Sequence, residues 1–409
     1  QTIEGRANGG IASILTGTDN SFLSEFTVSY KKKWSIHDIS AVAGVTAQQF
    51  GDRDQSSQGS GFSSDATRTD NMGLGDPTKY IVTSGRQANS LLSYLGRVNY
   101  NLLDKYLLTA SLRVDGSSRF GDNNKYGFFP AVSAGWTLSN EKFMQNVMWV
   151  TNLKIRGSYG IVGNDKLNTR FLFLDNYSQI TGGLSTDPVF SRPGTGVQFG
   201  LPTSLVNYQV VVPTSFGNPD VTWEKGTKRN IGLEASLFNS ALSIVVDVFD
   251  ENRVDILTNR SSGLQTYGQA YPALNIGRVY NRGYEVEANY RRSTRILDWG
   301  ISAQVSYARN KIISRDEPPG RPDYLKQEGK PVGQFFGFLT EGFYQSQDDI
   351  NNSPTNTLGR PIPGDLKYKD YNNDGKIDAD DVVPIGYSRT PEYIYSFSPS
   401  ISYKGVSLN

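Results

Sequence analysis

The segment from Asp370 to Asp381 carries the densest group of side chains that could do chemistry. It reads DYNNDGKIDADD and has an oxygen-bearing side chain at every second position before Gly375. A hard divalent cation such as Ca²⁺ needs roughly six to eight oxygen ligands that converge from a tight loop. The spacing therefore predicts a structural calcium site formed by Asp370, Asn372, Asp374, the carbonyl oxygen of Lys376, Asp378 (directly or through water) and Asp381.

Two features of this segment leave a second interpretation open. Its twelfth position is Asp381 rather than glutamate, which shortens the reach of the ligand that would bind the ion with both oxygens. The sequence also gives no sign of helices on either side. The alternative is a polar turn in which Asp, Asn and Gly fold the backbone without a metal. Mg²⁺ fits less well than Ca²⁺ because it demands near-ideal octahedral geometry and dehydrates reluctantly.

Catalytic side chains are sparse. His37 is the single histidine and the chain has no cysteine, so the familiar zinc sites and catalytic triads cannot assemble. The acid pairs Asp348-Asp349 and Asp380-Asp381 are adjacent, whereas glycosidase carboxylates must face each other across several ångströms. Lys and Arg number 41 against 40 acids, which leaves a formal charge of +1 and no field that attracts nucleic acid. We therefore expect neither an enzyme nor a nucleic-acid-binding protein.

Apolar residues recur at every second position through much of the chain, which is typical of strands with one dry and one wet face. Residues 231–237 and 242–248 form one such pair around a tight turn at Asn239-Ser240. These segments run to about ten residues, the length of a tilted transmembrane strand, whereas globular strands run to about five or six. We predict antiparallel strands near residues 92–101, 105–116, 228–239, 241–251, 281–291 and 299–309, with the apolar set facing lipid.

The connections between these strands have two sizes. Short ones lie near residues 101–105 and 239–240, whereas long polar ones run near 162–220, 252–276 and 312–390. Outer-membrane β-barrels show this asymmetry, and no window of the chain approaches the ~20 apolar residues of a spanning helix. We therefore predict an all-β chain, an antiparallel transmembrane β-barrel with long extracellular loops. The alternative is a soluble β-sandwich.

Aromatic residues cluster near the ends of the expected strands, where rings with a polar tip suit the headgroup level of a bilayer. In a sandwich they would instead be core residues. Others fall in the long connections, where they could stack on a sugar or a peptide or pack the loops together. The first group is Tyr94, Tyr100, Tyr106, Tyr126, Phe128, Phe129, Trp136, Tyr393, Tyr395 and Phe397; the second is Phe171, Phe173, Tyr177, Phe190, Tyr208 and Tyr267.

Several segments resemble the barrel of SusC/RagA-type, TonB-linked outer-membrane proteins. The most specific runs from Leu91 to Met144 and reads LLSYLGRVNYNLLDKYLLTASLRVDGSSRFGDNNKYGFFPAVSAGWTLSNEKFM. Others are LKIRGSYGIVGN from Leu153, NPDVTWEKGTKRNIGLEASLFNSALSIVVDVFD from Asn218, NRGYEVEANY from Asn281, GQFFGF from Gly333 and GDLKYKDYNNDGKID from Gly364. These segments cover most of the chain from Leu91 onward, and residues 1–90 are less distinctive.

The resemblance implies a TonB-dependent importer in the cell outer membrane of a Gram-negative bacterium, with a plug inside a barrel of about 22 strands. It implies uptake of an oligosaccharide or peptide too large for a porin. Energy would come from TonB-ExbB-ExbD acting through the plug, and a SusD-like lipoprotein would cap the extracellular loops.

No plug is evident in the sequence, and a new strand begins near Val406. We therefore expect residues 1–409 to be a fragment that holds about half of a barrel, without the plug domain and the C-terminal strands. Two alternative functions stay open. One is a surface adhesin or other binding barrel that transports nothing, and the other is a passive porin.

Overall fold

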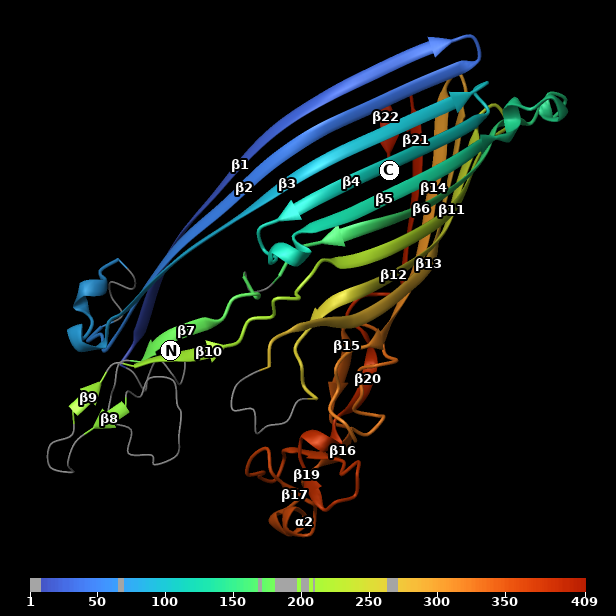
Figure 1. Cartoon of the computed structure of the whole chain (residues 1–409). Helices are drawn as coiled ribbons and strands as arrows, with labels where there is room; N and C mark the ends of the chain where they lie inside the picture. The colour runs from blue at the N-terminus through green and yellow to red at the C-terminus, as the bar shows by residue number, and fades with distance from the viewer. Residues whose placement is uncertain are drawn as a thin grey trace.

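The computed structural model describes residues 9–64, 70–167, 171–180, 197–199, 206–208, 210–262 and 271–409. Its main element is one sheet of 12 antiparallel strands that curves into part of a barrel wall (Figure 1). The strands follow one another across the sheet in chain order. They are β1 (Ile11–Trp34), β2 (His37–Ser60), β3 (Ile81–Leu102), β4 (Tyr106–Ser117), β5 (Tyr126–Thr137), β6 (Val150–Asn164), β11 (Glu224–Leu237), β12 (Leu242–Thr258), β13 (Leu274–Ser293), β14 (Leu297–Ser314), β21 (Tyr393–Tyr403) and β22 (Val406–Leu408).

The six strands predicted from alternation are confirmed as β3, β4, β11, β12, β13 and β14, and each pairs antiparallel with its neighbours. Leu233 lies opposite Ile155 on one side and Val246 on the other, so the apolar positions of adjacent strands share one face. The alternation only weakly indicates β1 and β2, which pair over their full 24 residues each. Serine, glutamine and glycine interrupt their apolar positions, which makes the alternation faint.

The two faces of the sheet differ in chemistry. Leu108, Leu112 and Val132 point outward and are exposed in the isolated chain. Their neighbours Thr109 and Ser111 on β4 point to the opposite, concave side, because successive residues of a strand face opposite ways. An exposed leucine and valine surface opposite a polar one is the arrangement of a barrel wall whose outside is covered by lipid.

The strands are joined mostly by short turns at one end of the strands and by longer segments at the opposite end. We call the first the turn end; its connections are 35–36, 103–105, 138–149, 238–241, 294–296 and 404–405. We call the opposite one the loop end; its connections are 61–80, 118–125, 165–223, 259–273 and 315–392. The expected short turns near residues 101–105 and 239–240 both lie at the turn end.

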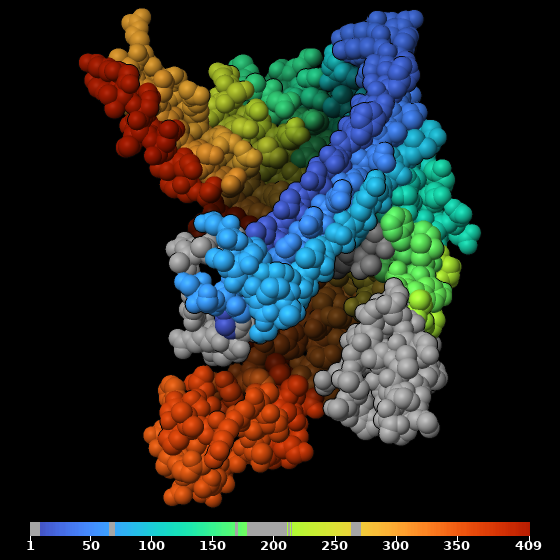
Figure 2. Space-filling model, turned by 90° about the vertical axis from the view of Figure 1, so that its left-hand side faces the viewer, coloured from blue at the N-terminus to red at the C-terminus, as the bar shows by residue number. Residues whose placement is uncertain are grey.

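The loop end carries most of the remaining structure. Small two-stranded sheets form from β7 (Asn176–Ile180) with β10 (Val210–Ser215) and from β8 (Val197–Phe199) with β9 (Val206–Tyr208). Residues 315–392, called the projecting body, contain β15 (Gln334–Gly337), β16 (Thr340–Phe343), α2 (Gln347–Asn351), β17 (Thr355–Asn356), β18 (Leu366–Tyr368), β19 (Lys376–Ile377) and β20 (Val383–Ser388). In Figure 2 this orange body extends away from the curved sheet.

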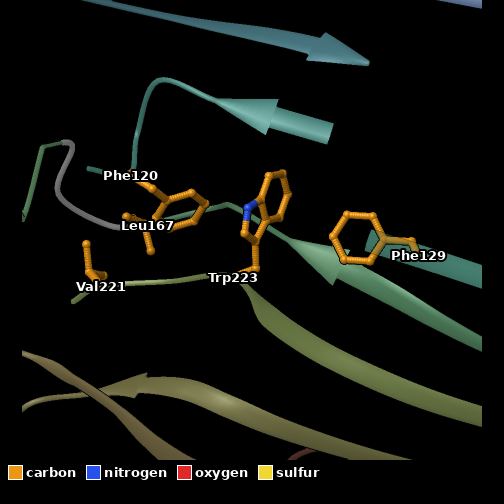
Figure 3. Close-up of a cluster of buried hydrophobic side chains, with 5 residues drawn as sticks. All are labelled: Phe120, Phe129, Leu167, Val221 and Trp223. Atoms are coloured by element: carbon orange, nitrogen blue, oxygen red, sulfur yellow. The ribbon is translucent and has the colours of Figure 1, made fainter. Parts of the chain in front are cut away.

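Buried apolar side chains are concentrated at the loop end. One cluster consists of Phe120, Phe129, Leu167, Val221 and Trp223, which come from the β4–β5 loop, β5 and the two ends of the β6–β11 connection (Figure 3). The described helices include none with the length and apolar character needed to cross a membrane.

Candidate functional site

A charged network lines the inner face of β6, β11 and β12. Arg156 is its centre: Nε donates to Glu234 Oε1 at 2.8 Å, Nη1 to Asn230 Oδ1 at 3.1 Å and Nη2 to Asp247 Oδ2 at 2.7 Å. Lys154 Nζ lies 3.5 Å from the other oxygen of Glu234. Two cations therefore face two carboxylates, and charge-assisted bonds of this kind fix the side chains in place. We call these five residues the inner-wall network.

Gly232 makes room for this network. It lies opposite Arg156 on β6 and opposite Asp247 on β12. A Cβ at position 232 would come 2.7 Å from both Arg156 Cζ and Asp247 Oδ1, a distance that real Cβ atoms do not tolerate. The glycine therefore allows the guanidinium to cross over β11 and reach the carboxylate of the next strand. The alternation revealed that charges share this face, but the pairing depends on three strands whose residues are far apart in sequence.

A hollow of about 560 Å³ opens on the inner face beside the network, toward the loop end. Its charged lining residues are Arg97, Lys228, Arg229, Asp250 and Glu251, and Lys228 Nζ lies 3.8 Å from Glu251 Oε2. Phe249 contributes a ring, and hydroxyl groups come from β4, β5 and β6. A pocket that combines an apolar ring with a few polar groups is suited to orienting a polar solute. The hydroxyl residues are Thr109, Ser111, Ser133 and Ser158.

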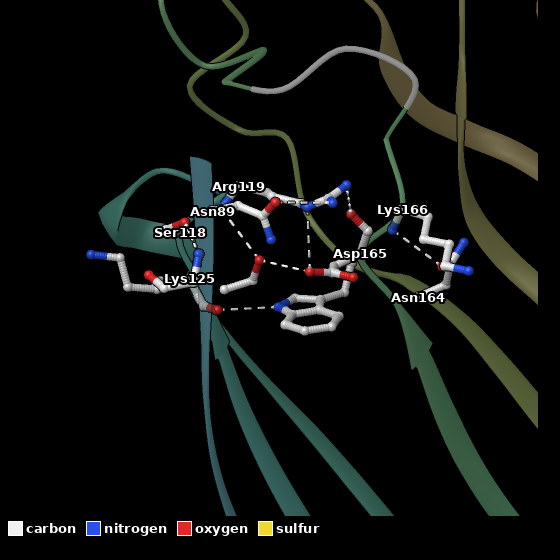
Figure 4. A network of polar contacts seen from close by, with 10 residues as sticks. Asn89, Ser118, Arg119, Lys125, Asn164, Asp165 and Lys166 are labelled. Atoms are coloured by element: carbon white, nitrogen blue, oxygen red, sulfur yellow. Dashed lines mark hydrogen bonds and ion pairs between the residues drawn. The ribbon is translucent and has the colours of Figure 1, made fainter. Parts of the chain in front are cut away.

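A polar brace ties the loop end of the wall together (Figure 4). Ser117 Oγ donates to Asp165 Oδ2 at 2.8 Å, and the Arg119 guanidinium donates to Asn89 Oδ1 at 3.3 Å and to the Asp165 carbonyl at 3.4 Å. Arg119 Nε also lies 3.8 Å from the Asp165 carboxylate. The brace therefore joins β3, the β4–β5 loop and the start of the β6–β11 connection.

The apolar cluster lies next to this brace. Trp223 packs against Phe120 and Phe129 with ring centroids 5.1 and 5.3 Å apart, and its Nε1 donates to the Lys125 carbonyl at 3.2 Å. A Cβ on Gly163 would collide with the Phe129 ring, so glycine is required where the ring crosses β6. Together the brace and the cluster fix where the loops leave the wall.

Phe129 corrects one sequence expectation. We grouped it with the rings that face lipid headgroups, but its side chain is buried in the apolar cluster on the inner side. Phe128 and Phe129 are adjacent in a strand, so only one of them can face outward, and Phe128 does. The alternation could have identified this, because Tyr126, Phe128 and Val132 share one parity.

The other rings form two bands on the outer face. Toward the loop end, Tyr307 lies between Tyr284 and Tyr393, with centroids 5.5 and 4.6 Å apart. Toward the turn end, Tyr106 lies 6.5 Å from Trp136. His37 belongs to this second band: its ring stacks between Trp34 and Tyr100, and its Nδ1 lies 2.7 Å from the Tyr100 hydroxyl. Two such bands, separated by aliphatic residues, mark the two surfaces of a bilayer.

Glu141, in the connection between β5 and β6, binds the turn-end band. Its carboxylate accepts from Lys105 Nζ at 2.9 Å, from the Tyr106 hydroxyl at 2.7 Å and from Trp136 Nε1 at 3.1 Å. These three donors, with Lys105 the strongest, lower the pKa of Glu141 from 4.5 to about 2. No sequence pattern predicts this contact, because a single glutamate in a turn is usually solvated.

The structure brings the six residues of the sequence-predicted calcium site into one loop of the projecting body. Asp370 accepts from the backbone N–H groups of Asp374 and Gly375 at 3.2 and 2.8 Å, and Asp374 Oδ1 accepts from Lys376 N at 2.9 Å. Asn372 Oδ1 accepts from Asp374 N at 3.0 Å. These bonds hold the sharp turn, in which Gly375 has φ +82°.

Asp378 and Asp381 close the same loop from its far side. Asp381 is only 1% exposed, and its two oxygens accept from Tyr371 N at 2.7 Å and Asp378 N at 2.9 Å. Asp378 Oδ1 accepts from Asp380 N at 2.8 Å and caps the short 3₁₀ helix that follows. Among the described residues, no group of three or more His, Cys, Asp or Glu is arranged to hold a metal ion. Calcium binding therefore stays a prediction.

The aromatic residues of the long loops are only partly described. Phe171 and Phe173 pack edge to face with centroids 6.1 Å apart, which favours packing between loop residues for this pair. Tyr177 is exposed. Tyr208 belongs to β9, and Phe190 and Tyr267 lie outside the described residues.

Comparisons with known proteins agree with this architecture. Residues 4–404 match the family described as TonB dependent receptor-like, beta-barrel. TonB-dependent receptor P26 of Formosa agariphila is 32% identical over 417 aligned residues, which cover 98% of this chain and 39% of that protein. TonB-dependent receptor SusC of Bacteroides thetaiotaomicron is 27% identical over 364 residues, covering 87% of this chain and 33% of that protein.

The RagAB peptide importer gives the structural comparison. Its "open-open" state matches with a TM-score of 0.72 at 21% identity, and its "closed-closed" state with 0.71 at 22%. Both matches cover 97% of this chain, and they cover 40% and 41% of the solved chains, respectively. The chain thus spans well under half the length of these relatives. Because the family match covers nearly every residue and the fold agrees, the chain belongs to the TonB dependent receptor-like β-barrel family.

Proposed function

We propose that the protein containing this chain is a TonB-dependent importer of glycans or peptides in the outer membrane of a Gram-negative bacterium. Membership of the family carries this proposal, since the relatives are named TonB-dependent receptors and one of them is SusC. The structurally similar RagAB is a peptide importer. The wall has the two faces that such a role needs: an apolar outside with two aromatic bands, and a charged inside that a polar solute could pass.

The inner face favours a polar substrate but does not choose between glycan and peptide. Phe249 beside Lys228, Glu251 and several hydroxyl groups could stack on a sugar ring or bind a peptide backbone. We therefore keep both substrate classes. Transport rather than catalysis is proposed, and the TonB-ExbB-ExbD complex would supply energy through a plug inside the barrel.

A SusD-like surface lipoprotein is the proposed partner. The projecting body lies at the loop end, which is the extracellular side of a barrel of this kind. It exposes Phe343, Ile362 and Leu366, and the first and last of these lie opposite each other on β16 and β18. Exposed apolar residues gathered on a water-facing body mark protein interaction sites. We call these three residues the docking patch.

Uptake measurements in cells that make the full-length protein test the importer. Accumulation of a labelled oligosaccharide or peptide should depend on TonB and stop when the proton gradient is dissipated. A passive porin would let the solute enter without TonB, and an adhesin would bind it at the surface without accumulation. Either result would contradict the importer proposal.

Co-purification in detergent tests the partner. A Phe343→Ser, Leu366→Ser double variant should lose the lipoprotein, because two of the three apolar contacts disappear. Ile231→Ser is the control: it removes an even more exposed apolar side chain from the lipid face, where an extracellular partner has no access. If the full-length protein purifies alone with uptake intact, the partner proposal is wrong.

A further inference from the structure

The connection between β5 and β6 is unlike the other connections of the turn end. Residues 138–149 read LSNEKFMQNVMW, whereas the other five connections contain two to four residues. Two 3₁₀ turns, Leu138–Asn140 and Lys142–Met144, shape this segment, which we call the apolar turn. In Figure 1 it projects as green coils beyond the ends of the neighbouring strands.

The apolar turn exposes large apolar side chains although its backbone is held in place. Phe143 is 63%, Met148 86% and Trp149 54% exposed. The Trp149 carbonyl accepts from Phe238 N at 2.7 Å, and the two rings lie 6.1 Å apart. Val147 N donates to the Met144 carbonyl at 2.9 Å. A short segment that displays three large apolar residues in a fixed shape needs a partner that removes them from water.

Glu141 places the start of the turn on the lipid side of the wall. Its donors Tyr106 and Trp136 belong to the outward-facing aromatic band, so the turn folds back against that band. Exposed apolar residues of the adjacent turns extend the same surface along the turn end: Ile36, Leu103, Phe238 and Ile296. The exposed residues of the apolar turn are therefore continuous with the lipid-covered face.

The charges of the turn suit the same environment. Glu141 and Lys142 are its only charged residues. Glu141 is mostly buried and paired with Lys105, which leaves Lys142 as the charge that the turn displays. Apolar and aromatic side chains beside an exposed lysine are the composition of segments that lie at the surface of a phospholipid leaflet, with the cation near the phosphates.

We infer that the apolar turn lies in the periplasmic leaflet of the membrane, with Phe143, Met148 and Trp149 among the phospholipid acyl chains and Lys142 at the phosphate level. The short turns have two to four residues each, whereas this turn is long enough to extend into the leaflet beside the wall. It adds a lateral anchor at one sector of the barrel, next to β4, β5 and β6.

Spin-label accessibility in the full-length protein, freed of any cysteine, tests this inference. The label is attached at Met148→Cys, and the protein is reconstituted into vesicles of phosphatidylethanolamine and phosphatidylglycerol. Oxygen concentrates in lipid and a nickel chelate in water. Val132→Cys, on the outer face of β5, gives the lipid reference, and the exposed Gln347→Cys on the projecting body gives the water reference. The oxygen-to-nickel ratio at 148 should be several-fold above that at 347 and close to that at 132.

Two results would overturn the inference. A ratio at 148 equal to that at 347 would place the turn in water, and low access of both reagents would show a protein partner or a second copy covering it. A Phe143→Ser, Trp149→Ser background supplies the second arm. There the ratio at 148 should fall several-fold while the ratio at 132 stays the same, which shows that the wall still folds. An unchanged ratio at 148 would mean that these residues do not hold the turn in lipid.

Discussion

The wall and the projecting body use the same apolar residue types in opposite ways. In the body, Leu325, Tyr344, Ile377 and Val383 are buried within the isolated chain. In the wall, isoleucine, valine and phenylalanine point outward, and Ile231 remains 69% exposed in the isolated chain. The body removes these side chains from water without a bilayer, as a domain in water must. The apolar outer face of the wall is instead removed from water by the bilayer. The stability of the wall therefore depends on lipid, whereas that of the body does not.

The largest expected loss of stability comes from a substitution that opens a cavity in the body. Ile377 is fully buried, so Ile377→Ala should destabilise the body by about 2–5 kcal/mol. Because the chain enters the body at the end of β14 and leaves it at the start of β21, the loss should be local. Limited proteolysis should then cut within residues 315–392 while the wall keeps its heat-resistant migration in detergent.

Ile231→Ala is the matched control, since it makes the same change at an exposed position of the wall and opens no cavity. Proteolysis of the body should be unchanged in this variant. Loss of the whole barrel in Ile377→Ala would show that the body and the wall fold as one unit.

A charge on the outer face should break the wall without affecting the body. Val132 lies on β5 midway between Phe128 and Trp136, near the middle of the apolar band. Val132→Arg should cost about 2–4 kcal/mol, the price of a cation at the bilayer midplane. Urea titration of the full-length protein in vesicles measures this loss.

The neighbouring residue separates the two faces. Ser133→Arg puts the same side chain on the inner face, where it meets water and other polar groups. It should unfold at nearly the wild-type urea concentration. Equal losses at 132 and 133 would contradict the assignment of the faces.

Face assignments were the part of the fold that sequence could predict best, because a strand alternates by geometry and a polar side chain cannot face lipid. The short turns near residues 101–105 and 239–240 predicted which strands form hairpins. What failed depended on contacts between distant residues. The partners of Arg156 lie 78 and 91 residues away, so only the folded sheet could pair them. The long polar stretch 312–390 was predicted to be a loop, although it contains short strands and buried side chains such as Ile377 and Val383, because these are scattered among polar residues.

The loop 370–381 lies between these cases. Its spacing predicted a tight turn, and the turn is present, with Asp370, Asp374 and Asp381 each accepting backbone N–H groups. Those bonds show why the residue types recur at that spacing even without an ion. Each carboxylate oxygen has a second lone pair, so the same geometry is compatible with a metal. The spacing in the sequence therefore cannot distinguish a carboxylate that only accepts backbone N–H groups from one that also binds a metal ion.

We propose that residues 370–381 bind Ca²⁺. The expected gain in stability is smaller than the losses above and is confined to the body. An ion that binds only the folded loop should stabilise the body by about 1.4 kcal/mol at a concentration tenfold above its Kd. Calorimetric titration of the full-length protein should release heat that an Asp370→Ala, Asp374→Ala double variant lacks. Asp122→Ala, an exposed carboxylate on the β4–β5 loop, is the control and should titrate as the wild type does. Equal heats from the double variant and the wild type would leave the motif as an acidic turn.

Acid should release the apolar turn from the wall, and this is the smallest effect expected. The pKa of Glu141 is lowered from 4.5 to about 2, first by the Lys105 hydrogen bond and then by those of Tyr106 and Trp136. A lowered pKa means that the charged carboxylate is the form the fold stabilises. Its contribution is therefore complete above pH 4.5 and is lost as the pH falls toward about 2. The thermal midpoint of the wild type should exceed that of Glu141→Gln above pH 4.5, and the difference should vanish toward about pH 2.

Asp122→Asn is the control: it removes a carboxylate that is 93% exposed and should change the midpoint little at any pH. A difference between wild type and Glu141→Gln that does not vary with pH would show that the shape of the side chain, rather than its charge, holds the turn against Tyr106 and Trp136.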